Sequence, residues 1–113
     1  VISGTGFWFL MEKNTPHYDL VVVKQEVIRL GAKAFTGSAM SSGKGMGLNL
    51  KRMQQAICSL DRRMFYKSMT CYTSHRSWQD VYHIGFHDLE LYIKITYCPN
   101  GGPPVISFKE KNL

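Results

Sequence analysis

A basic segment with interleaved aromatic residues could hold a nucleic acid. Between Lys51 and Arg76 there are six cationic side chains and one acidic side chain, Asp61. Lysine and arginine can hold a phosphate backbone while aromatic faces stack on unpaired bases. For a single residue a solvated basic surface is the simpler explanation, but the segment as a whole favours polyanion binding. The cations are Lys51, Arg52, Arg62, Arg63, Lys67 and Arg76, and the aromatic residues are Phe65, Tyr66, Tyr72 and Trp78.

Polar side chains also lie inside apolar, strand-like segments. Tyr92 and Lys94 share one face of a predicted strand, opposite Leu91, Ile93 and Ile95. Lysines in such positions can simply protect a sheet edge from aggregation, and from these residues alone this explanation is preferred. The other polar residues of this kind are Lys67 in FYKSM, Gln79 in WQDVY and Lys109 in VISFK.

The four histidines could form a metal site or an acid–base pair. His83 and His87 are four residues apart, but they lie in strand or turn sequence, where this spacing does not bring two side chains together as a helix would. We therefore predict no metal site. His75, next to Arg76 in a predicted loop, is instead a candidate for contacting a phosphate or a base.

The tract from Gly37 to Gly45 resembles a nucleotide-binding loop at first sight. Five residues instead of four separate Gly37 from Gly43, and Gly45 takes the position of the Ser or Thr that would bind magnesium. No strand precedes the tract. We interpret it as a loop and predict no nucleotide and no other small-molecule cofactor.

The composition favours a single basic domain. The 113 residues carry a net charge of +6, which attracts nucleic acid, an acidic protein or an anionic membrane surface. Three cysteines without a CxxC pair favour a reducing cytoplasm. No apolar run is long enough to span a membrane. Residues 1–10 lack a basic leader and a cleavage site, so we interpret them as an N-terminal extension before a domain of residues 11–113.

The apolar pattern changes from a helical to a strand period near Asp61. Helices are predicted over 19–30, with Asp19 as the N-cap, and over 49–60, and the Ser- and Gly-rich stretch 37–47 is predicted as a loop. A short helix over 33–40 is a weaker alternative. Helices followed by hairpin-linked strands predict an α+β fold in which N-terminal helices pack on a C-terminal antiparallel sheet. The strands are predicted over 64–72, 78–86, 90–96 and 105–109, with a turn at 100–104.

Four ordered blocks resemble the strand motifs of the motility quorum-sensing regulator (MqsR) family of toxins. Residues 11–13 and 15–17 also resemble the start of that family, so the resemblance extends from Met11 to Lys111. The sequence departs from the family pattern in residues 1–10, in the stretch around Gly43 and in the turn from Pro99 to Pro104. The blocks are FYKSMT (65–70), WQDVY (78–82), LYIKIT (91–96) and VISFKEK (105–111).

The resemblance implies a RelE-like fold and cleavage of messenger RNA at GC-containing triplets. It also implies a cognate antitoxin that carries a zinc-binding domain. By motif position it identifies the active-site group as Lys67, Gln79, Tyr92 and Lys109. The basic residues Arg62, Arg63, His75, Arg76 and Lys94 are then the candidates for binding RNA.

The hypothesis that follows is cleavage without a metal ion, because RNA carries its own nucleophile, the 2′-hydroxyl. Lys67 and Lys109 would stabilise the phosphate charge, Tyr92 would act as acid or base, and Gln79 would orient an oxygen atom. Two alternatives fit the same basic surface: a non-enzymatic regulator that binds nucleic acid, and an interaction protein whose cations meet an acidic partner.

Overall fold

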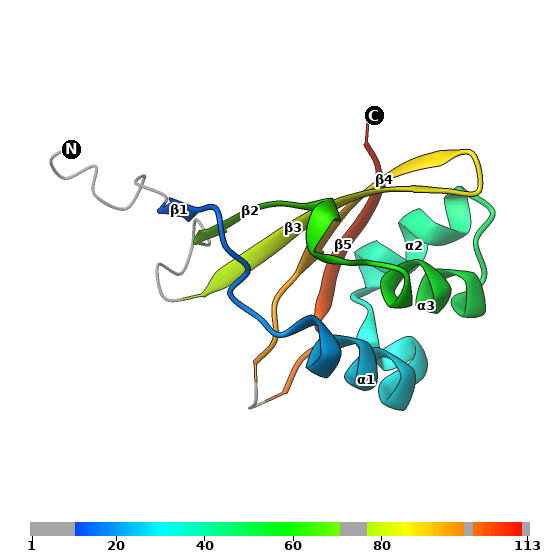
Figure 1. Cartoon of the computed structure of the whole chain (residues 1–113). Coiled ribbons are helices and arrows are strands. Elements are labelled where there is room, and N and C mark those ends of the chain that lie inside the picture. The colour runs from blue at the N-terminus through cyan, green and yellow to red at the C-terminus, as the bar shows by residue number, and fades with distance from the viewer. Residues whose placement is uncertain (1–10, 71–76, 99–100, 112–113) are drawn as a thin grey trace, which may run out of the picture.

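In the part of the chain that the structure describes, the fold is a five-stranded antiparallel sheet with three α-helices gathered on one side, as Figure 1 shows for a computed structural model. The structure describes residues 11–70, 77–98 and 101–111. The predicted α+β class and antiparallel sheet are confirmed. None of the helices in the described ranges is long and apolar enough to cross a membrane. The predicted extension 1–10, together with His75 and Arg76, lies outside the described residues.

The elements follow one another so that the sheet order equals the chain order, β1-β2-β3-β4-β5. All four predicted strands begin within one residue of the predicted positions, and three of them also end within one residue. The last two residues predicted for β2 lie outside the described ranges. The two-residue strand β1 was not predicted. The elements are β1 (Glu12–Lys13), α1 (Leu20–Leu30), η2 (Gly31–Ala34), α2 (Gly37–Gly45), α3 (Leu50–Cys58), η3 (Arg62–Met64), β2 (Phe65–Thr70), β3 (Trp78–Phe86), β4 (Leu89–Ile95) and β5 (Val105–Glu110).

Helices α1 and α3 begin where side-chain caps stand in the sequence. The Asp19 carboxylate accepts a hydrogen bond from the Val21 amide, and the Asn49 side chain accepts one from the Arg52 amide. Gly31, with a φ of 60°, ends α1 in a conformation that glycine adopts at little cost. Both helix predictions are confirmed.

The prediction of a loop over 37–47 is wrong for residues 37–45, which form α2. The Thr36 hydroxyl caps this helix by accepting a hydrogen bond from the Ala39 amide. Gly43 is buried, and a Cβ atom there would collide with the Met53 sulfur atom. This glycine therefore serves a close approach between α2 and α3, which a count of glycines and serines does not reveal.

One face of the sheet forms the core with the helices. Inward side chains of β3, β4 and β5 alternate with outward ones, and they pack on Val23, Val27, Met53 and Ile57 of α1 and α3. All members of this core that come from the sheet are nearly or fully buried, which fixes the face each strand presents to the helices. They are Tyr82, Ile84, Leu91, Ile93, Ile95, Val105 and Phe108.

The carboxylate of Asp80 on β3 connects this strand to β2 and to the segment that leads into α1. It is 1% exposed and accepts hydrogen bonds from the backbone amides of His17 and Tyr18 at 2.9 to 3.0 Å, and from the Ser68 hydroxyl at 2.6 Å. Ser68 is also the residue on β2 that pairs with Asp80 in the sheet. One buried charge thus binds β2 to β3 and holds the segment that leads into α1.

We expect opposite effects from the same substitution at two glycines of α2. Gly43→Ala should lower the free energy of unfolding by about 1–3 kcal/mol, because the buried Met53 side chain must move. Gly45→Ala should raise it by about 0.5–1 kcal/mol, because nothing lies within 4 Å of the added Cβ atom and alanine favours a helix. Urea denaturation measures both, and equal effects at the two positions would contradict the close approach described for Gly43.

Replacing Asp80 with Asn should destabilise the protein by about 2–4 kcal/mol, because an amide has one acceptor oxygen for a site that holds several donors. Glu90→Gln makes the same chemical change at an exposed position of β4 and should change stability by less than about 0.5 kcal/mol. Thermal and urea unfolding of the two variants provide the comparison. Similar stabilities would show that the Asp80 contacts are not important for the fold.

Candidate active site

We call the face of the sheet opposite the helices the open face; it carries the outward side chains of β2, β3, β4 and β5. Directly paired residues of antiparallel strands point to the same side, so the strand register places these residues in rows. One row runs Lys67, Val81, Lys94, Ser107, and the next runs His83, Tyr92, Lys109. Met69 and Gln79 form a further row beside Lys67 and Val81. All four predicted catalytic residues therefore belong to the open face.

A bulge in β2 brings two consecutive side chains to the site. Phe65 pairs with Tyr82, and Lys67 pairs with the next residue, Val81, so that Tyr66 is the extra residue. A bulge turns a side chain away from the strict alternation of a strand. As a result the Tyr66 ring stacks on the ring of His83, which lies on the open face beside the Lys67 row.

Lys67 is held as a cation by Glu12 on β1. Its ammonium donates a hydrogen bond of 2.9 Å to the Glu12 carboxylate, and the two side chains are 26% and 54% exposed. This hydrogen bond raises the pKa of Lys67 above its ordinary value; burial acts against it, and the charges of Glu12, Tyr66 and Tyr92 add to it. Lys67 therefore suits the stabilisation of negative charge and does not suit the role of a base.

Tyr92 and Lys109 lie beside each other in a shallow depression of about 260 Å³ at the β5 side of the open face. Lys94 lines it too, with its ammonium 5.7 Å from the centre of the Tyr92 ring. The further lining residues are Glu110 and Lys111. The depression collects three lysines and one acid around a phenol, so a phosphate group fits its charge.

His83 connects the two ends of the site. Its ring stacks on Tyr66, with 4.5 Å between ring centroids, and contacts Tyr92 at a tilt, with 5.0 Å between centroids. Burial lowers the pKa of His83 below its ordinary value; the charge of Lys111 acts in the same direction, and Glu90 acts against it. The neutral imidazole is thus favoured between the two tyrosines.

His83, Tyr66 and Glu12 were not among the predicted site residues. His83 could have been found, because it lies four residues after Gln79 on the same strand and so shares its face. Tyr66 could not have been found, because strict alternation would place its side chain on the other face of the sheet from Lys67. Glu12 enters through the unpredicted strand β1.

The structure unites most of the predicted residues and leaves two apart. Lys67, Tyr92, Lys94 and Lys109 lie on adjoining rows, and Gln79 lies on the same face. Arg62 and Arg63, in η3, have partners of their own. Arg62 donates a hydrogen bond to the Asn14 carbonyl and lies over the Phe65 ring, and Arg63 pairs with Asp61. Their role in binding RNA remains a prediction, like those of His75 and Arg76 outside the described residues.

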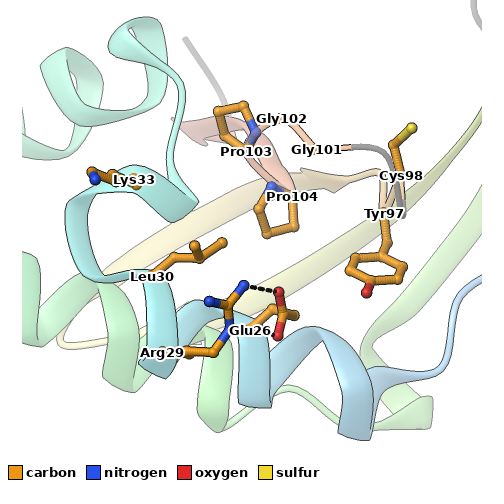
Figure 2. Close-up of a pocket in the computed structure, with 10 residues that line it drawn as sticks. All are labelled: Glu26, Arg29, Leu30, Lys33, Tyr97, Cys98, Gly101, Gly102, Pro103 and Pro104. Atoms are coloured by element: carbon orange, nitrogen blue, oxygen red, sulfur yellow. Dashed lines mark hydrogen bonds and ion pairs between the residues drawn. The ribbon is translucent and has the colours of Figure 1, made fainter.

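A second cavity, of about 300 Å³, lies between the end of α1 and the connection from β4 to β5. Figure 2 shows the Arg29–Glu26 ion pair at its side, with Lys33 and Tyr97 among the other lining residues. None of the residues that line this cavity was predicted to be catalytic. Its lining adds one lysine, one phenol and one thiol to that ion pair, whereas the open face gathers several lysines around Tyr92, and we assign the chemistry to the open face.

Among residues 11–70, 77–98 and 101–111, no three His, Cys, Asp or Glu side chains lie close enough together to hold a metal ion. What the open face offers instead is a set of ammonium groups, a phenol, a neutral imidazole and an amide. Together with the fold, this set defines a small basic α+β protein whose open sheet face can bind a phosphate diester and transfer protons.

The sequence matches the family model described as motility quorum-sensing regulator, toxin of MqsA, over residues 15–110. It is also 40% identical over 101 residues to the mRNA interferase toxin MqsR of Escherichia coli strain K12. The aligned residues cover 89% of this chain and 100% of that protein. The chain therefore belongs to the motility quorum-sensing regulator family of toxins, as the sequence motifs indicated.

The low pKa of His83 predicts how stability depends on pH. In the unfolded chain this histidine takes up a proton near its ordinary pKa of 6.5, whereas the folded protein takes it up only at lower pH. The free energy of unfolding should therefore decrease as the pH falls from about 7 to about 5.5.

His83→Phe keeps an aromatic ring without a titrating group and should make this decrease smaller. His17, whose pKa is also lowered by burial, should leave some decrease in place. An equal decrease in both proteins, measured by urea unfolding, would contradict the burial of His83.

Proposed function

We propose that this chain is an endoribonuclease that cleaves messenger RNA on its open face. The observation that carries the proposal is the arrangement of Lys67, Tyr92 and Lys109 on adjoining rows of the sheet face opposite the helices. The name of the E. coli relative, an mRNA interferase toxin, supports the same activity. The net charge of +6 supports a polyanionic substrate.

The proposed reaction is an attack by the 2′-hydroxyl of the RNA on its neighbouring phosphate. The new bond joins the 2′-oxygen to phosphorus, the bond to the 5′-oxygen breaks, and the products carry a cyclic phosphate and a 5′-hydroxyl. The 2′-hydroxyl loses a proton and the leaving oxygen gains one. The phosphate oxygens carry the most negative charge in the pentacoordinate transition state, which nearby cations therefore stabilise more than the bound RNA.

Each residue has a role that follows from its position. Lys67, kept protonated by Glu12, and Lys109, exposed at the end of the Tyr92 row, stabilise the phosphate charge. Tyr92, between His83 and Lys109 in that row, transfers a proton. Gln79 cannot exchange a proton at neutral pH, so its amide orients a phosphate oxygen or the attacking hydroxyl.

Several finer features complete the proposal and come from the family resemblance. They are cleavage at GC-containing triplets, neutralisation by a cognate antitoxin with a zinc-binding domain, a RelE-like variant of the α+β fold, and action in the cytoplasm. The description of the matching family as a toxin of MqsA supports a protein antitoxin.

Loss of either Lys67 or Lys109 should slow the chemical step far more than it weakens RNA binding. For Lys67→Ala and Lys109→Ala we expect the single-turnover rate at saturating RNA to fall on the order of a hundredfold or more, because each removes a donor to the phosphate charge. Tyr92→Phe should also slow the reaction while the ring keeps its packing. The matched control is Lys33→Ala, which removes the same charge beside the second cavity and should keep nearly the full rate. Near-normal rates in the folded site variants would show that the active site is misassigned.

Cleavage should persist in excess EDTA, because the RNA supplies the nucleophile and the proposed stabilising charges are lysines. Mapping the ends of a cleaved RNA of known sequence should give 5′-hydroxyl termini. Loss of activity in EDTA with recovery on adding magnesium would refute this mechanism. Binding of the RNA without any cleavage would favour the alternative function, a non-enzymatic regulator.

A further inference from the structure

Tyr66 exposes an aromatic ring beside the proposed active site. Among the residues that the structure describes, the exposed large apolar side chains are Met11, Val21, Ile28 and Tyr66, and Tyr66 is 54% exposed. His83 covers one face of the Tyr66 ring. The exposed area lies on the parts of the ring that neither His83 nor the Lys67 ammonium covers, where a flat partner can stack.

The Tyr66 ring is held in position by its contact with His83. His83 stacks on it at an interplanar angle of 23°, and the His83 ring in turn contacts the Tyr92 ring at an interplanar angle of 37°. The bulge at Tyr66 fixes the direction in which the side chain leaves β2. A ring that is already ordered loses little conformational entropy when a ligand stacks on it.

Tyr66 and Lys67 lie close enough together for one nucleotide to contact both. The Lys67 ammonium lies 5.4 Å from the centre of the Tyr66 ring. In RNA a base and its own phosphate are separated by a single ribose. A base stacked on the outer face of Tyr66 would leave its phosphate within reach of Lys67, and a nucleic acid bound in single-stranded form is commonly held in this way, by an aromatic platform next to a cation.

We propose that Tyr66 is the platform for one unpaired base of the RNA next to the phosphate held by Lys67, and that His83 is a positioning residue for this platform. The inference rests on the proposed function, since it takes RNA to be the substrate. It assigns the ligand as a nucleobase recognised by its flat face, without hydrogen bonds that would select one base. The contact therefore adds affinity and fixes the register of the chain, while sequence selection must come from other residues.

The test combines protein variants with RNAs that lack single bases. A six-nucleotide RNA with one GC-containing triplet and 2′-fluoro groups throughout cannot be cleaved, and versions with one abasic position each scan the whole length. Fluorescence anisotropy measures their affinities for the wild type and for Tyr66→Leu. We expect one abasic position to weaken binding to the wild type about tenfold, and Tyr66→Leu to weaken binding of the intact RNA by a similar factor. The two losses should not add, because each removes the same stacking contact.

Conservative variants separate stacking from a general effect on the fold. Tyr66→Trp and His83→Phe keep flat rings and should bind nearly as the wild type does, whereas His83→Leu should weaken binding several-fold. Tyr97→Leu, a tyrosine beside the second cavity, should leave binding unchanged. Additive losses for Tyr66→Leu and every abasic position would overturn the inference. If the wild type also cleaves the 2′-hydroxyl form of this RNA, the proposed function stands even then. Non-additive losses without cleavage would support the platform and refute the nuclease.

Discussion

The hydrogen bond between Ser68 and Asp80 is the contact on which the geometry of the site depends. It lies on the helix side of the sheet, but it fixes which residue of β2 is opposite which residue of β3. A shift of one residue in that pairing would turn the Lys67 side chain to the wrong face of the sheet. The same carboxylate holds the amides of His17 and Tyr18 and so anchors the segment between β1 and α1. The residues of the site are thus positioned by a residue that is not part of it.

The two faces of the sheet have separate tasks. The helix face supplies the core, and its alternation of buried side chains fixes which residues point outward. The open face then gathers cations that would repel one another in a core but that can share an anion in contact with water. Glu12 partly balances this charge at Lys67, while Lys94 and Lys109 lie around Tyr92. The bulge in β2 adds an aromatic ring to a face that alternation alone would leave to the lysine.

Local signals in the sequence predicted the elements with caps or a clear period. The Asp19 cap marked α1, the helical period of apolar residues marked α3, and the alternation in β4 correctly assigned Tyr92 and Lys94 to one face. Features that depend on contacts between distant residues were missed. Helix α2 was predicted as a loop because the role of Gly43 depends on Met53, ten residues away. The stacking of Tyr66 on His83 depends on a bulge, which has no local signature here. The proposed catalytic residues came from the family motifs, since a lysine on a strand has a simpler explanation when it is considered alone.

The proposed function requires RNA to bind on the open face of the sheet, opposite the helices. A titration of isotope-labelled protein with an uncleavable 2′-fluoro RNA, followed by the resonances of individual side chains, tests it most directly. We expect the largest changes at Lys67, His83, Tyr92 and Lys109, with little change at Lys33 and Tyr97 beside the second cavity. Changes concentrated around Lys33 and Tyr97, with the open face unaffected, would contradict it.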